Sequence, residues 1–444
     1  MDLDLFAACL PGLEPLLADE LKALGAEPEP AAGGVEFYGS RDLLLRAHLH
    51  LGTASHLLLR AASFRCLNLA ELERKVASLQ WREWLQPSVP IAVHATAKKS
   101  RLYHTGAIEE RVAKGIAGAM GIDVASKVKP LAPPKPKTSE QRSLSAAAKR
   151  GRGPNAKNPL PKYVAAAKVK AEADAAAAAI AAAAPPPPTP VQILAATVAG
   201  GPSAVAIAVR FVDDQCTISI DTASTPLHRR GYRLESSKAP LREDLAFALV
   251  KAAGFGPGSS LLDPFCGSGT IAIEAAMMAA GLPPGRLRSA PLQGLVIADD
   301  AAWTTLCASV PPPLSTRIEG TRIAASDRDA GAIEAATHNA QRAGVLAALE
   351  LHCCSVSAAP WLEDPHNAPQ PLLVATNPPF GVRIGMVQDL APLYQTLGHR
   401  IAQLQNARLA VLAHDLRLCR RTGRPMKFAF ATRHGGLGVT ALVG

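Results

Sequence analysis

The 444-residue sequence lacks several features that would assign it to particular protein classes. Apart from a short alanine tract, it has no run approaching the roughly 18 apolar residues of a membrane span. Its eight cysteines form no CxxC pair and no metal-ligand spacing, so neither a disulfide framework nor a metal site is indicated. The acidic opening leads directly into domain-like sequence, which argues against a targeting peptide. We therefore expect no membrane and no metal, and a cytoplasmic location, or an organellar one if a leader has been removed.

Aromatic residues are scarce, at 4%, while positive charge is in excess, with a formal net charge of +10. That excess is concentrated, because residues 127–170 hold twelve Lys and Arg and a single acid. Residues 128–190 are rich in Pro, Ala and Lys and cannot bury enough apolar surface to offset their ordering entropy. The composition predicts a disordered basic insertion, serving either as a flexible arm that contacts nucleic-acid phosphates or as a tolerated loop without a role.

The hydrophobic pattern changes along the chain. Before the insertion, short strands and amphipathic helices alternate, which is typical of an α+β module. From residue 259 onward the order becomes strand, glycine turn, helix, which predicts a Rossmann-like α/β domain with a doubly wound, mostly parallel sheet. Residues 426–432 and 438–442 alternate like a closing antiparallel hairpin, whereas 299–318 and 361–371 look like loop expansions. Ligands of such sheets bind at the carboxyl ends of the strands, where we look for chemistry.

The first strand end of this sheet carries a glycine turn, DPFCGSGT, over residues 263–270. Gly267 and Gly269 allow a tight turn and a close approach of the backbone to a ligand. The helix expected to begin near Thr270 would present free amide groups to that ligand. A nucleoside-like cofactor fits, although structural turns share this pattern.

The second strand end carries acidic residues that suit a ribose. Asp327 is placed to accept hydrogen bonds from both ribose hydroxyls, as acids do in other nucleotide-binding sheets of this kind. Asp329 lies directly before a predicted helix, and we interpret it as the cap of that helix.

The third strand end, Asn377-Pro378-Pro379-Phe380, is the most specific signal in the chain. An exocyclic amine on an aromatic base is a poor nucleophile because its lone pair is delocalised. The Asn377 side-chain oxygen and the Pro378 carbonyl are expected to accept its two protons. The two prolines stiffen the loop, and Phe380 offers a face for an unstacked base. The alternative, a plain turn before a helix, fits this position after a fourth strand poorly.

These motifs resemble those of the THUMP-domain-containing class I RNA methyltransferases, and among them most resemble the RlmL-type large-subunit rRNA guanine-N2 enzymes. The resemblance spans nearly the whole chain apart from 128–190, and it is carried by these segments: DPFCGSGT (263–270) with IEAA (273–276), NPPFGVRIG (377–385), LHRRGYR (227–233), APLREDLA (239–246) and FAACLPGLE (6–14).

The resemblance implies a division into three domains. A ferredoxin-like subdomain would occupy residues 1–60. A THUMP RNA-binding domain would occupy residues 61–222, interrupted by the insertion 128–190. A methyltransferase domain that uses S-adenosylmethionine would occupy residues 223–444.

The resemblance also implies site residues. Asp263, Gly267 and Gly269 would line the cofactor at its methionine end, Asp327 would bind its ribose, and residues 377–380 would bind the target base. Phe265 would also bind the cofactor. The family usually has an acidic residue near the adenine, where this chain has Ser355, a weaker hydrogen-bonding partner. Larger RlmL-type proteins also carry a second methyltransferase half, which this sequence does not contain.

Six basic residues are candidates for RNA contacts. Arg229, Arg230 and Arg233 either touch phosphate or brace the junction between domains. Lys98, Lys99 and Arg101 follow a predicted THUMP strand and are similar candidates. Because aromatics are few, recognition of folded RNA by its shape fits better than stacking along a single strand.

The sequence leaves several functions open. The leading interpretation is formation of N2-methylguanosine in large-subunit rRNA, and the runner-up is the same reaction on tRNA. Adenine-N6 methylation is a further alternative, because the 377–380 loop suits any amino nitrogen. From a different class, the chain could be a non-catalytic RNA-binding or ribosome-assembly factor with a degenerate methyltransferase fold, an interpretation that Ser355 favours and the intact loop opposes.

Overall fold

The structure is a computed structural model that describes residues 2–87, 89–121, 204–223, 225–235, 240–380, 382–383, 386–387 and 390–444. The predicted insertion 128–190 lies outside these residues. Within them, no helix is both long enough and apolar enough to cross a membrane. No group of three or more His, Cys, Asp or Glu side chains in the described part is arranged to hold a metal ion.

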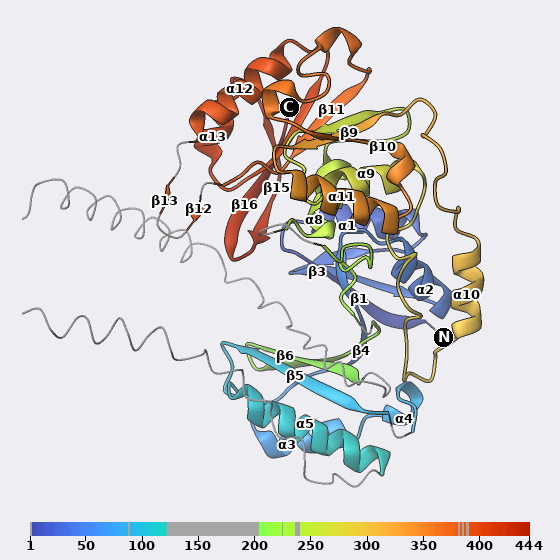
Figure 1. The fold of residues 1–444 in the computed structure, drawn as a ribbon. Coiled ribbons are helices and arrows are strands. Elements are labelled where there is room, and N and C mark those ends of the chain that lie inside the picture. Colours follow the sequence, from blue (N-terminus) through green and yellow to red (C-terminus); the bar gives the residue numbers. More distant parts are fainter. Residues whose placement is uncertain are drawn as a thin grey trace, which may run out of the picture. The chain divides into compact units, whose positions relative to one another are not determined.

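The first half of the chain forms a seven-stranded sheet of order β2-β3-β1-β4-β7-β6-β5 (Figure 1). All neighbours are antiparallel except β5 and β6. Its elements are β1 (Leu3–Cys9), α1 (Glu14–Ala23), β2 (Glu29–Ala31), β3 (Gly34–Gly39), α2 (Arg41–His50), β4 (Ala54–Arg65), α3 (Leu69–Ala77), α4 (Trp81–Trp84), β5 (Ile91–Lys98), α5 (Thr105–Met120), β6 (Val205–Val212) and β7 (Gln215–Asp221).

Alternating burial in these strands shows why one sheet face carries the helices. In β6 every odd-numbered residue from Val205 to Phe211 is buried, and every even-numbered one is only partly buried. The period of two places apolar side chains on one face, where helices such as α5 pack. The twelve-residue β4 pairs with β1 on one side and β7 on the other. The domain boundary predicted at residue 60 therefore falls inside a strand that belongs to both halves of the sheet.

The second half forms another seven-stranded sheet, of order β10-β9-β8-β11-β14-β16-β15. Its elements are α8 (Glu243–Ala252), β8 (Ser260–Asp263), α9 (Thr270–Ala279), α10 (Asp300–Ala308), β9 (Ile323–Asp327), α11 (Ala330–Arg342), β10 (Leu349–Cys353), β11 (Leu372–Thr376), the short pair β12 (Val382–Arg383) and β13 (Met386–Val387), α12 (Ala391–Ala402), β14 (Arg408–Ala413), α13 (Leu416–Arg420), β15 (Lys427–His434) and β16 (Leu437–Val443).

This second sheet confirms the predicted α/β class. Strands β10, β9, β8, β11 and β14 run parallel, and β16 and β15 close the sheet antiparallel. The central strands β8 and β11 are buried at every position, as expected for a parallel sheet covered on both faces. Because its strands are parallel, the ends of β8, β9, β10 and β11 lie along one edge, which brings the three predicted motifs together.

One of the expected loop expansions contains a helix. Residues 299–318 include α10, whose first turn is capped by Asp299, since its Oδ1 accepts a 2.8 Å hydrogen bond from the amide of Ala302. The helix buries Trp303, an apolar anchor, and ends at Ala308 before the prolines at 311–313. Residues 361–371 contain only a three-residue 3-10 turn.

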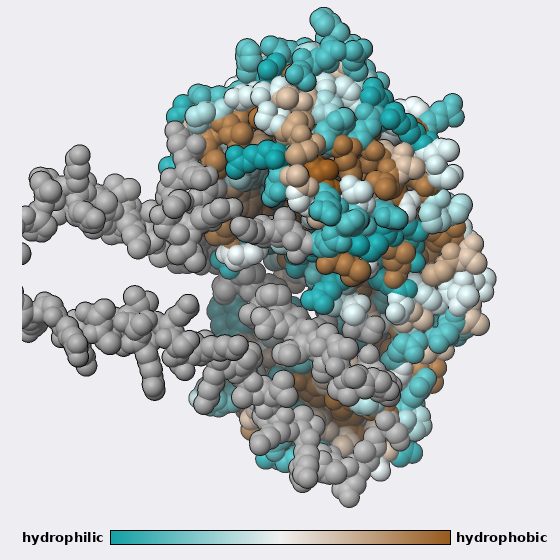
Figure 2. Space-filling view, viewed as in Figure 1, coloured by the Kyte–Doolittle hydropathy of each residue, from teal (hydrophilic) through white to brown (hydrophobic). Residues whose placement is uncertain are grey.

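On the face shown in Figure 2, hydrophobic residues gather in the middle of the part that holds the second sheet, surrounded by hydrophilic ones.

Candidate functional site

The glycine turn after β8 adopts a backbone that requires its glycines. Gly267 and Gly269 have φ angles of 51° and 84°, in the left-handed region. A Cβ at Gly269 would lie 2.9 Å from the Cβ of Ala336 on α11, so a larger residue would be excluded by packing as well as by strain. Gly269 is also the N-cap of α9. The turn thus presents the unpaired amides of a helix start at the sheet edge.

Asp327, at the end of β9, joins the first two motifs. Its Oδ2 accepts a hydrogen bond from the Gly267 amide at 3.0 Å, and its Oδ1 accepts one from the Asp329 amide at 3.0 Å. Each carboxylate oxygen keeps a free lone pair, and the side chain is only partly buried. Asp329 caps α11, since its Oδ1 accepts a 3.0 Å hydrogen bond from the Gly331 amide, which confirms its interpretation as a cap.

Asp263 lies behind the turn rather than on its surface, with 1% of its area exposed. Its Oδ1 accepts hydrogen bonds from the Phe265 amide at 3.1 Å and from the Thr376 hydroxyl at 2.7 Å. Burial raises the pKa of Asp263 to about 7; its two hydrogen-bond donors oppose the rise, and the negative charge of Asp327 adds to it. The carboxyl group therefore titrates near neutrality. Phe265 is half-buried beside it.

The Asn377–Phe380 loop, which follows β11, contains a hydrogen-bond acceptor that has no partner among the described residues. The Oδ1 atom of Asn377 is buried and accepts no hydrogen bond within the described part of the chain. A buried acceptor without a partner is costly, and such groups are few in folded proteins. Pro378 is buried and Pro379 is exposed, while the half-buried Phe380 ring lies 6.1 Å from the ring of His414. The loop is therefore shaped to receive a hydrogen-bond donor. Gly381, Ile384 and Gly385 of the predicted motif lie outside the described residues.

Ser355 lies at the same sheet edge, two residues beyond Cys353, which pairs with Asp327 in the register of β10 and β9. Its side chain is exposed, and its Oγ lies 3.0 Å from the Oγ of Ser357. The structure thus brings the predicted cofactor and base residues to the ends of four adjacent strands.

The structure corrects one predicted RNA contact. Arg230 is fully buried, and its guanidinium donates to the carbonyl oxygens of Leu227 and Gly52 and pairs with Glu274 at 3.5 Å. It cannot reach a phosphate because no part of the residue is exposed, and it braces the junction instead. Arg233 is similarly held by Glu243 at 2.9 Å, with 15% of its side chain exposed. Arg229 is exposed.

The other three predicted RNA contacts lie together at the end of β5 and on the turn that follows it. Lys98, Lys99 and Arg101 are exposed, and within the described part of the chain their charged groups form no ion pair. The turn is held by Asp214, whose Oδ1 accepts a 2.7 Å hydrogen bond from the Arg101 amide. Tyr103, which was not among the predicted contacts, is 66% exposed and follows this run of charges; an aromatic residue beside a basic cluster was the available signal.

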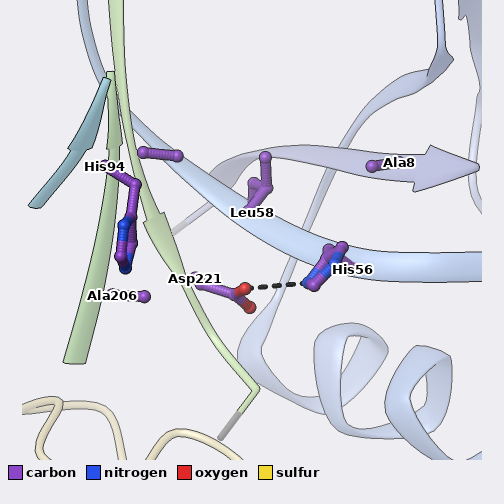
Figure 3. A pocket seen from close by; sticks show the side chains of 7 residues that line it. Ala8, His56, Leu58, His94, Ala206 and Asp221 are labelled. Carbon is purple, nitrogen blue, oxygen red and sulfur yellow. Dashed lines mark hydrogen bonds and ion pairs between the residues drawn. The ribbon is translucent and has the colours of Figure 1, made fainter. Parts of the chain in front are cut away.

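A separate small cavity lies on the first sheet (Figure 3). It has a volume of about 30 Å³, and its polar lining is a 2.9 Å pair between His56 and Asp221 together with His94. A space of that size admits a water molecule and excludes a nucleoside. The cavity is therefore unrelated to the strand-end site.

The chain is similar to known methyltransferases in both of its halves. Residues 230–434 match the RMKL-like methyltransferase domain, and residues 4–58 match the RlmL ferredoxin-like domain. The ribosomal RNA large subunit methyltransferase K/L of Syntrophotalea carbinolica is 29% identical over 410 residues, which cover 89% of this chain and 47% of that protein. The chain therefore spans about half the length of that relative.

Two further proteins are similar to this chain over nearly the full length of both partners. A Synechocystis protein that is named provisionally as an RNA methyltransferase is 27% identical over 98% of this chain and 95% of its own length. The crystal structure of a provisionally named methyltransferase complexed with SAH superposes with a TM-score of 0.74 and 22% identity, over 100% of this chain and 97% of the other. At that identity the structural likeness shows a shared fold.

Proposed function

This chain carries an RMKL-like methyltransferase domain preceded by an RlmL ferredoxin-like domain, and on that premise we propose that it methylates N2 of a guanine in large-subunit rRNA, using S-adenosylmethionine. The observation that carries the proposal is the unpartnered Asn377 Oδ1 at the sheet edge that also holds the glycine turn and Asp327. An acceptor for an amine and a turn suited to a nucleoside cofactor thus meet in one place.

The cofactor fits the residues at the ends of β8, β9 and β10. The start of α9 supplies backbone amides for its polar groups, and Asp327 retains lone pairs for the ribose hydroxyls. The Gly267 amide is already bonded to Asp327, so this partly exposed glycine contributes a close approach of the backbone. Ser355 is exposed on the adenine side. When bound, S-adenosylmethionine supplies an electrophilic methyl group on a sulfonium.

Asn377 makes the target amine reactive. Its Oδ1 and the Pro378 carbonyl accept hydrogen bonds from the two N–H groups of the amine, which draws the nitrogen lone pair out of conjugation with the ring and orients it. The rate then depends on this orientation rather than on a strong base. The nitrogen becomes positively charged when it gains the methyl group, so its N–H is acidic and releases its proton to solvent. Phe380 offers its face to the base, which must leave its stack to reach the loop.

The RNA is held from the first sheet. Lys98, Lys99 and Arg101 form an exposed cationic turn for phosphates, and Tyr103 beside them offers an exposed ring. These contacts position the RNA without reading its sequence.

The deciding experiment incubates the purified full chain with labelled S-adenosylmethionine and either large-subunit rRNA or tRNA, and identifies the labelled nucleosides by mass spectrometry. We expect N2-methylguanosine in the rRNA, and none with Asn377→Ala. Label confined to tRNA, or present as N6-methyladenosine, would replace the proposed substrate. If the protein does not bind the cofactor and no RNA becomes labelled, the remaining role is non-catalytic RNA binding.

A further inference from the structure

A segment that joins the two halves of the chain is tied to the helix behind the glycine turn. Arg342 on α11 donates from Nε to the backbone oxygen of Tyr232 at 2.8 Å, and His338 on α11 lies 3.0 Å from the Glu235 carboxylate. We call residues 227–235 the bridge. Within the bridge, Arg230 donates to the carbonyl oxygen of Gly52, in the segment between α2 and β4. The bridge therefore contacts both sheets' domains through specific polar groups.

Asn339 links the bridge to the glycine turn. It is fully buried on α11, and its Nδ2 donates to the backbone oxygens of Glu235 at 3.0 Å and Ser268 at 3.2 Å. Its Oδ1 accepts a 2.6 Å hydrogen bond from Arg342. Both amide protons and the carbonyl oxygen of this side chain therefore form hydrogen bonds, and all three partners belong to the protein.

The bond to Ser268 fixes the conformation of the turn. Ser268 lies between the two left-handed glycines, and its carbonyl belongs to the same peptide plane as the Gly269 amide. The oxygen of this plane is held by Asn339, and its N–H donates to Cys266 O at 2.8 Å. Glycines turn freely, so a peptide between two of them is easily reoriented unless it is held at both ends.

We propose that Asn339 is a positioning residue for the cofactor. It locks the Ser268–Gly269 peptide so that the turn presents its amides in one orientation, and through the Glu235 carbonyl it connects that peptide to the bridge and so to the N-terminal half. Asn339 touches neither cofactor nor base. A turn that is already ordered pays no ordering cost when the cofactor binds. Removing the Asn339 side chain should therefore weaken cofactor affinity and leave the rate of methyl transfer unchanged. This inference rests on the proposed function.

The test measures S-adenosylmethionine affinity by calorimetry, together with melting temperature and steady-state kinetics, on the full chain. For Asn339→Ala we expect the Kd and the KM for the cofactor to rise about tenfold, with kcat at saturating cofactor within about twofold of wild type. Gln341→Ala is the matched control, because Gln341 is exposed on the same helix, and it should leave Kd and KM unchanged.

Glu235→Ala provides a second test in case the buried substitution Asn339→Ala impairs folding. Glu235 is 43% exposed, and the change removes its contacts to His338 and Arg342 without touching the turn. We expect the Kd to rise about threefold with an unchanged melting temperature. An unchanged Kd in both variants, or a fall in kcat at unchanged Kd, would overturn the inference. A wild-type chain that binds no cofactor would instead overturn the proposed function.

Discussion

The Thr376 hydroxyl donates a 2.7 Å hydrogen bond to the Asp263 carboxylate and so ties the end of β11 to the end of β8. Asp263 opens the glycine turn, and Thr376 directly precedes Asn377. The two loops that would hold the cofactor and the base are therefore joined behind the site by one buried contact. The spacing between them is fixed by a side chain that is itself 1% exposed.

Asp263 should make stability depend on pH. Its pKa is raised by burial from 3.8 to about 7, so the folded state binds a proton between these values that the unfolded state releases. This contribution to stability is fully present below pH 3.8 and is lost as the pH rises through about 7. We expect Asp263→Asn to match wild type near pH 4 and to exceed it at pH 8 by up to about 4 kcal/mol in urea unfolding.

The difference between the two proteins isolates this group, because other buried acids such as Glu243, whose pKa is also about 7, titrate in both. Stability curves that run parallel from pH 4 to pH 8 would show that Asp263 is ionised throughout.

Asn377→Ala should abolish transfer while leaving the cofactor bound. Removal of the acceptor leaves the base amine with one partner of two and its lone pair in the ring. We expect kcat to fall by at least about 100-fold and the cofactor Kd to stay within about twofold. Single-turnover assays at saturating cofactor measure the first, and calorimetry measures the second. Asn367→Ala, which changes an exposed asparagine in a surface turn, is the control. Full activity of Asn377→Ala contradicts the proposed role.

Asp327 and Asp329 offer a matched pair of acids two positions apart. Asp327→Ala removes the ribose acceptor and the hydrogen bond to Gly267, so the cofactor Kd should rise about tenfold or more. Asp329→Ala removes the cap of α11, which should cost about 1 kcal/mol of stability with little change in Kd. Calorimetry and thermal unfolding of both variants separate the roles. An equal loss of affinity in the two variants would assign the effect to the turn as a whole.

The sequence predicted the strand-end site because each motif carries its own local signal. Glycine pairs, an acid after a strand and the Asn-Pro-Pro-Phe loop are read within a few residues, and the parallel sheet then places them on one edge. The parallel sheet, its closing antiparallel hairpin and the cap at Asp329 were predicted from the same local patterns, whereas the spatial order of the strands was not. These features depend on neighbours in sequence.

Contacts between distant segments could not be predicted in this way. Arg229 and Arg230 are adjacent in a basic run, yet one is exposed and the other is paired with Glu274, 44 positions later. Asn339 looks like an ordinary helix residue until α11 is packed against the turn and the bridge. Burial of a polar side chain is decided by which elements meet, and hydrophobic periodicity carries no information about its partner.

The cationic turn should contribute to RNA affinity through charge. Replacing Lys98, Lys99 and Arg101 together with Ala removes three exposed positive groups. We expect weaker RNA binding and a shallower dependence of log affinity on log salt, by about two units where the contacted RNA is single-stranded and about three where it is paired. Filter binding at several salt concentrations measures this, with cofactor affinity unchanged. An unaltered salt dependence would place the RNA elsewhere on the protein.

Arg229 and Arg230 allow buried and exposed charges to be compared at adjacent positions. Arg230→Met leaves the buried Glu274 carboxylate, whose pKa burial already raises, without its cationic partner. Breaking a buried pair on one side typically costs about 3–5 kcal/mol, and the exposed Arg229→Met should cost less than about 0.5 kcal/mol. Denaturant unfolding of both variants measures the difference. Adding Glu274→Gln to Arg230→Met should restore part of the loss, because it removes the stranded charge. No restoration would mean that the hydrogen bonds of Arg230 to Gly52 and Leu227, and not its charge, stabilise the junction.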